Sequence, residues 1–254
     1  MAAALQPSAV RWGSISHPGR RLTLAWQAKY FCMKRLLREN GLSLVLFGLF
    51  FAAFILGQVI FGWKDYNSDR EEHRQPVVSL SQYLGSGHFL EATMENWESE
   101  FLQMGVYVIL TAVLYQKGSA ESKSLSGSEP VDRDPRRFKN KKQAPWPVRR
   151  GGWVLAIYEH SLALAFTLLF LISLFLHAAG GKSVYNEEQI LHGQPPVSLF
   201  GYMATSRFWF ESFQNWQSEF LAIGSMVVLT IFLRQRGSPE SKPVDSPHWQ
   251  TGSE

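Results

Sequence analysis

Two glutamates, each one helical turn after an asparagine, are the residues whose types and spacing could do chemistry. The motif Asn-Trp-x-Ser-Glu-Phe-Leu occurs at residues 96–102 and again at residues 215–221. Residues four apart share one face of a helix, so each copy groups a carboxylate, an amide and an indole. If the copies face each other, two carboxylates held close could form a cation or proton site, because their repulsion raises one pKa. This candidate cation site consists of Glu100, Glu219, Asn96, Asn215, Trp97 and Trp216.

The alternative for these six residues is structural. An asparagine and a glutamate one turn apart can hydrogen-bond each other, the preceding loop or lipid headgroups. A tryptophan at the start of an apolar run is typical of an interfacial anchor. A duplicated protein also repeats its structural residues, so the recurrence itself does not favour a functional site.

Other catalytic or metal-binding groups are sparse. His73 and His192 could supply metal ligands near the candidate site. However, His73 has arginines nearby and His192 precedes a glycine, so we predict no metal site and no cofactor. Cys32 is the only cysteine, which excludes an internal disulfide. The sequence has no Gly-rich phosphate loop, nucleophile elbow or helical His-Glu zinc motif, so we predict that the protein is not an enzyme.

The motif belongs to a longer internal repeat. At an offset of 119, residues 66–123 match residues 185–242 at 27 of 58 positions. Chance does not give this level of identity, so we interpret it as a duplication. Each copy begins with an apolar run and continues through a polar loop into a second helix.

The apolar runs predict membrane helices. Residues 42–62 and 161–181 carry no Asp, Glu, Lys or Arg, and about 20 apolar residues span a bilayer. Their few polar residues are Gln58, Thr167 and His177.

We expect the second helices to cover 88–116 and 207–235, with Ser86 and Ser206 as N-caps and only their apolar C-terminal parts in the bilayer. The predicted fold is all-α: an integral membrane four-helix bundle of two parallel-topology two-helix repeats, whose second helices extend beyond the membrane.

The charge distribution predicts the orientation. Seven Lys and Arg residues precede the first span and ten lie in residues 117–150, whereas the loops at 63–100 and 182–219 hold three and two. Positive charge stays on the cytoplasmic side, so we expect both termini and the linker in the cytoplasm. The predicted partners are the lipid bilayer and another membrane protein or a second copy, and we expect no nucleic acid.

The predicted domain organisation follows the repeat. We expect residues 1–32 to be either a disordered tail after a start at Met1 or a mis-called start, with translation beginning at Met33. A first membrane repeat would follow at 33–117. A basic disordered linker would follow at 118–150, a second membrane repeat at 151–236 and a disordered tail at 237–254. The linker residues predicted to contact lipid headgroups are Arg136, Arg137, Lys139, Lys141, Lys142, Arg149 and Arg150.

Several motifs resemble a family of bacterial membrane proteins classed as a domain of unknown function. They are Leu-Leu-Arg-Glu-Asn-Gly-Leu at 36–42, Tyr-Asn-Glu-Glu-Gln at 185–189, His-Gly-Gln-Pro-Pro-Val-Ser-Leu at 192–199 and Arg-Gln-Arg-Gly-Ser-Pro-Glu-Ser-Lys at 234–242. The first copy departs from the third motif, with Arg74 and Val77 where the second copy has Gly193 and Pro196. The resemblance implies a bacterial inner membrane but no activity.

Two functions follow from these patterns. The first hypothesis is a non-enzymatic scaffold or partner-binding bundle that presents amphipathic helices outside the membrane. The alternative is a small cation or proton transporter or channel that uses Glu100 and Glu219.

Overall fold

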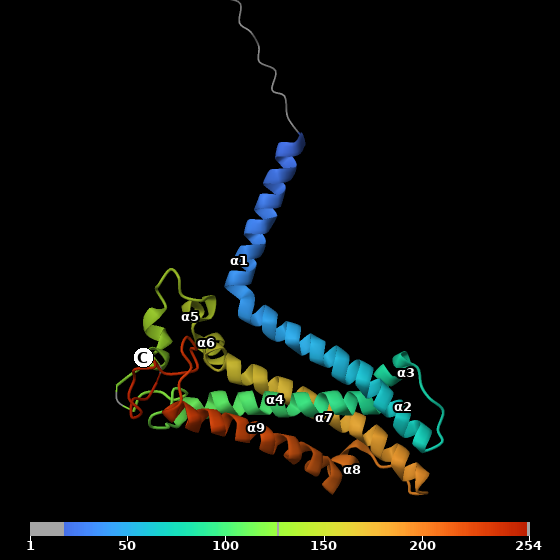
Figure 1. Cartoon of the computed structure of the whole chain (residues 1–254). Helices are drawn as coiled ribbons and strands as arrows, with labels where there is room; N and C mark the ends of the chain where they lie inside the picture. Colours follow the sequence, from blue (N-terminus) through green and yellow to red (C-terminus); the bar gives the residue numbers. More distant parts are fainter. Residues whose placement is uncertain (1–17, 126, 253–254) are drawn as a thin grey trace, which may run out of the picture. The chain divides into compact units, whose positions relative to one another are not determined.

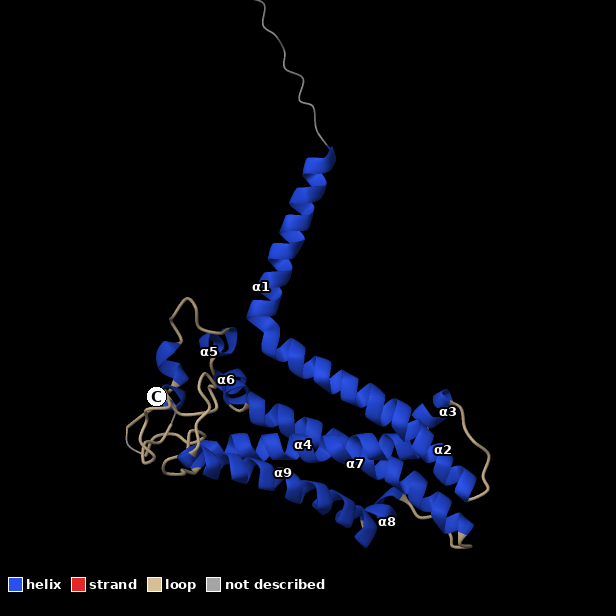
Figure 2. Ribbon diagram, in the orientation of Figure 1, coloured by secondary structure: helices blue, strands red, loops and turns tan. Residues whose placement is uncertain are grey.

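The computed structural model describes residues 18–125 and 127–252, all of whose regular elements are helical (Figure 2). Predictions made for residues 1–17 and 253–254 lie outside the described residues. The chain divides into two compact units, Met1–Gly57 and Gln58–Glu254. Each unit is described by itself.

The first unit consists of one long helix. Helix α1 (Pro18–Ala53) bends at Asn40, whose φ of −129° is not helical. The backbone continues as a π-helix, η1 (Phe54–Phe61), into the second unit. Residues 18–32, predicted as a tail or mis-called start, are helical in α1. The side chains of residues 42–53 are exposed.

The second unit is built around three long helices. Helix α4 (Gly87–Val113) packs most extensively on α7 (Ser161–Leu191) and also on α9 (Ser206–Phe232) (Figure 1). The shorter elements are α2 (Gly62–Glu72), α3 (Leu80–Leu84), α8 (Leu199–Met203), α5 (Trp146–Arg150), α6 (Gly152–Glu159) and the 3₁₀ turns η2 (Pro130–Asp132) and η3 (Pro135–Phe138).

The elements recur at the offset of 119 found in the sequence. Helices α3 and α4 have the same lengths as α8 and α9. Each begins 119 residues before its counterpart in the sequence. In both copies an asparagine, Asn67 or Asn186, exchanges two hydrogen bonds with a loop backbone, at Val78 and at Val197. The same hydrogen bonds therefore shape both loops.

The caps differ in part from those predicted. The Ser86 hydroxyl accepts a hydrogen bond from Phe89 N–H and caps α4 as expected. Thr205, and not Ser206, caps α9 by accepting from Phe208 N–H. The prediction of Ser206 was wrong because Thr205 is the residue 119 positions after Ser86, and its hydroxyl makes the same bond.

Burial in the described residues is the reverse of that in a water-soluble protein. The buried set includes Glu91, Glu98, His177 and nine other polar residues, against six hydrophobic ones. Large apolar side chains of α7, such as Leu168 and Phe175, are exposed. The helices thus contact one another through polar groups and present apolar groups outward.

Two helical stretches of the described residues, Met33–Glu72 and Ser161–Leu191, are long and apolar enough to cross a membrane. These include the two runs predicted as first spans. The apolar parts of α4 and α9 do not reach this criterion, as expected from their short length.

Residues 118–150 and 237–254 were predicted to be disordered. In the structure, the described part of 118–150 contains turns and the short elements η2, η3 and α5, and residues 237–252 form turns and bends. The buried Lys242 ammonium donates hydrogen bonds to the backbone oxygens of Gly118, His248 and Gln250. Gly252 N–H donates to the Ser119 oxygen at 2.9 Å. A lysine surrounded by carbonyl groups can order a segment of low hydrophobicity.

The crossing of α4 and α7 depends on glycine. A Cβ at Gly180 would lie 2.5 Å from the Glu91 nitrogen and 2.8 Å from the Gly87 oxygen. These are backbone atoms, which cannot move aside without separating the helices. Small residues permit such close approach in membrane helices.

Gly180→Ala should therefore destabilise the protein by about 1–3 kcal/mol, because the added methyl overpacks this contact. Thermal unfolding of the purified protein in detergent measures the effect. Gly224→Ala in α9 is the matched control, since a Cβ there meets open space and alanine favours a helix by up to about 1 kcal/mol. Equal midpoints for the two variants would contradict the close packing.

Candidate functional site

The six residues of the predicted cation site have different surroundings. Asn215 donates a hydrogen bond to Glu95 at 2.6 Å, and the indole of Trp216 donates to Glu98 at 3.0 Å. Asn96 is exposed and donates to the Ala92 oxygen of its own helix.

The remaining members include the two predicted carboxylates, which interact: burial, and then the charge of Glu100, raises the pKa of Glu219. Glu100 is exposed, and Trp97, which is half-buried, contacts the Phe101 ring. Glu219 is half-buried, and its backbone oxygen accepts a hydrogen bond from Gln103.

The two loop histidines perform the same structural role. Nδ1 of His73 lies 2.9 Å from the Asp69 oxygen, and Nδ1 of His192 lies 2.8 Å from the Glu188 oxygen. Each ring thus lies against a carbonyl in the last turn of its own helix, and this carbonyl also accepts the backbone N–H of the same histidine. This similarity was not expected from their different sequence neighbours.

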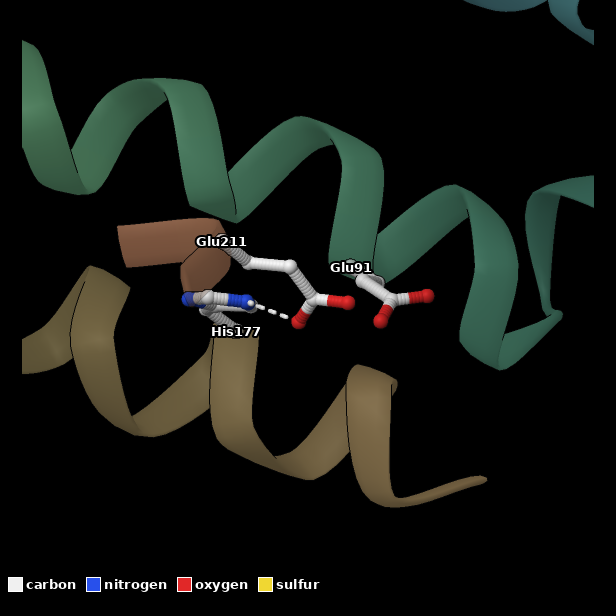
Figure 3. A group of neighbouring side chains, drawn as sticks. All are labelled: Glu91, His177 and Glu211. Carbon is white, nitrogen blue, oxygen red and sulfur yellow. Dashed lines mark ion pairs between the residues drawn. The ribbon is translucent and has the colours of Figure 1, made fainter. Parts of the chain in front are cut away.

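A different group, formed by Glu91, His177 and Glu211, brings three metal-binding side chains together. They come from α4, α7 and α9, and one ligand atom of each lies within 4.8 Å of the other two (Figure 3). Nε2 of His177 lies 3.6 Å from Oε2 of Glu211. Among the described residues, this is the group that could hold a metal ion.

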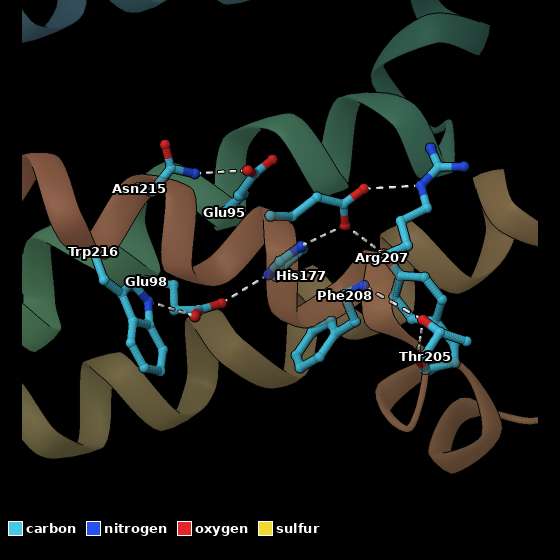
Figure 4. Close-up of polar contacts among 10 residues, drawn as sticks. Glu95, Glu98, His177, Thr205, Arg207, Phe208, Asn215 and Trp216 are labelled. Carbon is cyan, nitrogen blue, oxygen red and sulfur yellow. Dashed lines mark hydrogen bonds and ion pairs between the residues drawn. The ribbon is translucent and has the colours of Figure 1, made fainter.

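His177 is held from its other side by Glu98 (Figure 4). Nδ1 of His177 lies 2.7 Å from Oε2 of Glu98, and both side chains are completely buried. The second carboxylate oxygen of Glu98 accepts the hydrogen bond from Trp216. The imidazole therefore has a fixed orientation, with Nε2 directed toward Glu211 and Glu91.

Glu211 is positioned by two further donors. Arg207 donates to Oε1 at 2.9 Å, and the Tyr202 hydroxyl donates to Oε2 at 2.7 Å. Gly181 makes room for this arrangement, because a Cβ there would overlap the Tyr202 hydroxyl and lie 2.8 Å from Oε1 of Glu91. The carboxylate of Glu211 can still accept another bond, since its two oxygens offer about four lone-pair positions.

Several buried polar atoms near this group have no hydrogen-bond partner. They include Oε1 of Glu91 and Nε2 of His177, together with the hydroxyls of Thr93 and Ser212. Buried polar groups are normally paired, since an unpaired one loses about 1–3 kcal/mol of solvation. Because Oε1 of Glu91 and Nε2 of His177 lie close together without hydrogen bonds, a bound ligand between them is favoured.

An acidic pocket of about 920 Å³ leads to Glu91 and Glu211. It lies between α2, the C-terminal part of α7 and the first turns of α4 and α9. Arg70 and Arg207 are the arginines of its lining, which has no lysine. The eight carboxylates that line it are Asp65, Asp69, Glu72, Glu91, Glu95, Glu187, Glu188 and Glu211.

The two glutamates at the end of this pocket differ in proton affinity. Both precede the apolar parts of their helices. Burial, and then the charge of Glu211, raises the pKa of Glu91 to about 7. Burial also acts to raise the pKa of Glu211, but its interactions with His177, Tyr202 and Arg207 outweigh burial and lower that pKa to about 2. Glu211 is therefore a permanent anion, whereas Glu91 is poised between its two forms at neutral pH.

The basic linker residues lie at the surface. All seven side chains predicted to contact lipid headgroups are exposed, around η3 and α5. They remain accessible to an anionic partner.

Sequence reasoning noted His177 only as a polar residue in an apolar span and missed its glutamate partners. One available signal was the spacing of Glu91, Glu95 and Glu98, which puts three carboxylates on one face of α4. A second was the pair Gly180-Gly181 directly after His177, which indicates a close helix contact at that level.

The chain belongs to a family defined as a domain of unknown function, DUF6766, whose model matches residues 33–253. This confirms the predicted resemblance to a family without an assigned activity. No curated protein and no solved structure matches the chain.

Proposed function

We propose that this chain is a non-enzymatic, multi-pass protein of a bacterial inner membrane that binds a cation in the acidic pocket on its outer face. In this proposal the duplicated unit crosses the bilayer twice per copy. The spans are residues 42–62 and 161–181 and the apolar ends of α4 and α9, with both termini and the linker in the cytoplasm.

Two features support a membrane location. The exposed apolar side chains of α7 suit a lipid environment, and the buried polar residues suit helix contacts that have no water. The distribution of Lys and Arg supports the orientation, because the acidic loops fall on the side opposite the linker.

The observation that carries the cation-binding proposal is the pocket itself. Eight carboxylates against two arginines create a strongly negative field, and the pocket ends at buried acceptors without partners. A low-dielectric wall strengthens the attraction of such a pocket for a cation. The proposed site is at Glu91 and Glu211, and not at Glu100 and Glu219, because only the former pair lies in a buried cluster.

The topology can be tested by labelling single cysteines in a Cys32→Ser background. In spheroplasts, a membrane-impermeant maleimide should react with Ile190→Cys at once, and with Asn140→Cys only after permeabilisation. Both residues are exposed, so accessibility of the thiols is not limited by the fold. Equal labelling of both sites in intact spheroplasts would refute the arrangement.

Cation binding can be tested by thermal unfolding of the chelator-treated protein in detergent. A cation bound only by the folded state adds about 2.7 kcal/mol at 100 times its Kd. We expect at least one divalent chloride to raise the Tm by several degrees, and choline chloride at matched ionic strength to have no effect.

The matched variants for this test remove equal numbers of charges. Glu187→Gln with Glu188→Gln alters the pocket and should weaken the Tm rise, while Glu240→Gln with Asp245→Asn alters only the exposed tail. If no divalent cation raised the Tm, the proposed function would be wrong.

Partner binding is a second candidate function, favoured by the exposed polar stripe of Asn96 and Glu100 on α4. A photo-reactive residue at position 100 should give a defined adduct in native membranes, with another membrane protein or a second copy. The same residue at the exposed tail position 245 is the control. Identical adduct patterns at the two positions, or none, would remove this candidate.

A further inference from the structure

His177 has the arrangement of a metal-binding histidine. Its Nδ1 is bonded to the buried carboxylate of Glu98 at 2.7 Å, and its Nε2 is buried without a hydrogen bond. In protein metal sites, a ligating histidine usually donates its other N–H to a carboxylate, which fixes the tautomer and directs the free lone pair at the metal. Trp216 in turn holds Glu98 through a hydrogen bond. The orientation of the His177 imidazole is therefore set by Glu98 and, through Glu98, by Trp216.

Glu91 supplies a second unsatisfied acceptor at the same point. Its side chain is 8% exposed, and its Oε1 has no hydrogen-bond partner. An ionised carboxylate buried without a counter-charge costs several kcal/mol. The guanidinium of Arg207, whose charge acts on Glu91, is already bonded to Glu211 and Glu188.

The spacing of the three ligand atoms fits one small cation. Bonds of about 2.0–2.2 Å from a metal to nitrogen and oxygen place neighbouring ligand atoms about 3–4 Å apart. The His177–Glu211 separation of 3.6 Å lies in this range, and all three atoms are within 4.8 Å of one another.

We infer that Glu91, His177 and Glu211 form a binding site for one divalent transition-metal cation, with Glu98 as the residue that orients the imidazole. The inference rests on the proposed cation-binding function and names the class of ion. One nitrogen and two carboxylate oxygens leave at least one coordination position for water from the pocket.

The imidazole of His177 indicates which class of metal ion this site would bind. Mg²⁺ and Ca²⁺ prefer oxygen ligands alone, whereas Zn²⁺ and other first-row divalent ions bind imidazole together with carboxylates. A purely structural ion-pair network would explain the Glu98–His177 and Arg207–Glu211 pairs. The network also includes the His177–Glu211 pair at 3.6 Å, which is longer than a hydrogen bond, but it leaves Oε1 of Glu91 without a partner beside that pair.

The site is asymmetric with respect to the repeat. At the offset of 119, His177 corresponds to Gln58, Glu91 to Phe210 and Glu211 to Ala92. We therefore expect one metal ion per chain and not two.

The test is a Zn²⁺ titration of the purified full-length protein after chelator treatment, by calorimetry and by metal analysis after desalting. The wild-type protein should bind one equivalent, and a large excess of Mg²⁺ should not displace it. Glu91→Gln and His177→Gln should weaken binding on the order of 100-fold or more, and Glu98→Gln by about 10–100-fold.

Glu95→Gln is the matched control, because Glu95 lines the same pocket and bonds Asn215 but is not a ligand. The Zn²⁺ affinity of the Glu95→Gln variant should stay within about threefold of the wild type. The charge of Glu95 acts on the metal only at a distance, where solvent screens it. Glu91→Gln also controls for folding, since the change is isosteric and breaks no hydrogen bond of Oε1.

Three results would overturn the inference: no saturable Zn²⁺ binding, equal affinity for Mg²⁺, or equal loss of affinity in Glu91→Gln and Glu95→Gln. In the last two cases a divalent cation would still raise the Tm, so the proposed cation-binding function would stand without this site. If no divalent cation stabilised the protein, both would fail.

Discussion

At Gly180 and Gly181 the backbone of α7 comes into direct contact with α4, and the arrangement of the second unit depends on this contact. The absence of side chains at these positions brings Glu91 beside α7 and leaves space for the Tyr202 hydroxyl. Close approach also removes water from between the helices, so the charged groups there must satisfy one another. The polar network from Trp216 through Glu98, His177 and Glu211 to Arg207 is the result.

The two copies of the repeat have kept their frame and diverged in their polar interior. The loops keep the same asparagine bonds, and the helices keep equivalent caps. Yet Arg207 corresponds to His88, and Glu98 corresponds to Gln217. The two stretches related by the offset of 119 thus share their helices and caps but not their buried groups.

The sequence was sufficient to predict the helices but not their contacts. Periodicity and caps located α4 and α9 to within a few residues, and the charge-free run located the start of α7, because these signals are local; α7 continues ten residues beyond the predicted span, to Leu191. The site residues follow from which face of α4 meets α7, and α4 carries two polar faces, one with Asn96 and Glu100 and one with Glu91, Glu95 and Glu98. To choose between the two faces, one must know that α4 and α7 cross at Gly87 and Gly180. This crossing depends on both helices together and cannot be predicted from the sequence of either one alone. The bend at Asn40 and the π-helical turns of η1 also had no local signal that we recognised.

The lysine at the end of each repeat illustrates how identical sequence acquires different roles. Lys242 reaches back to the backbone oxygen of Gly118, whereas its counterpart Lys123 bonds Ala112 and Asp132 within the first copy and linker. The tail of the second copy thus reaches the end of the first, and Ser119 of the first copy in turn bonds Thr230 in the last turn of α9. Lys242 gathers carbonyl groups of its own tail and one from the first copy, so a single side chain ties the C-terminal ends of both halves together.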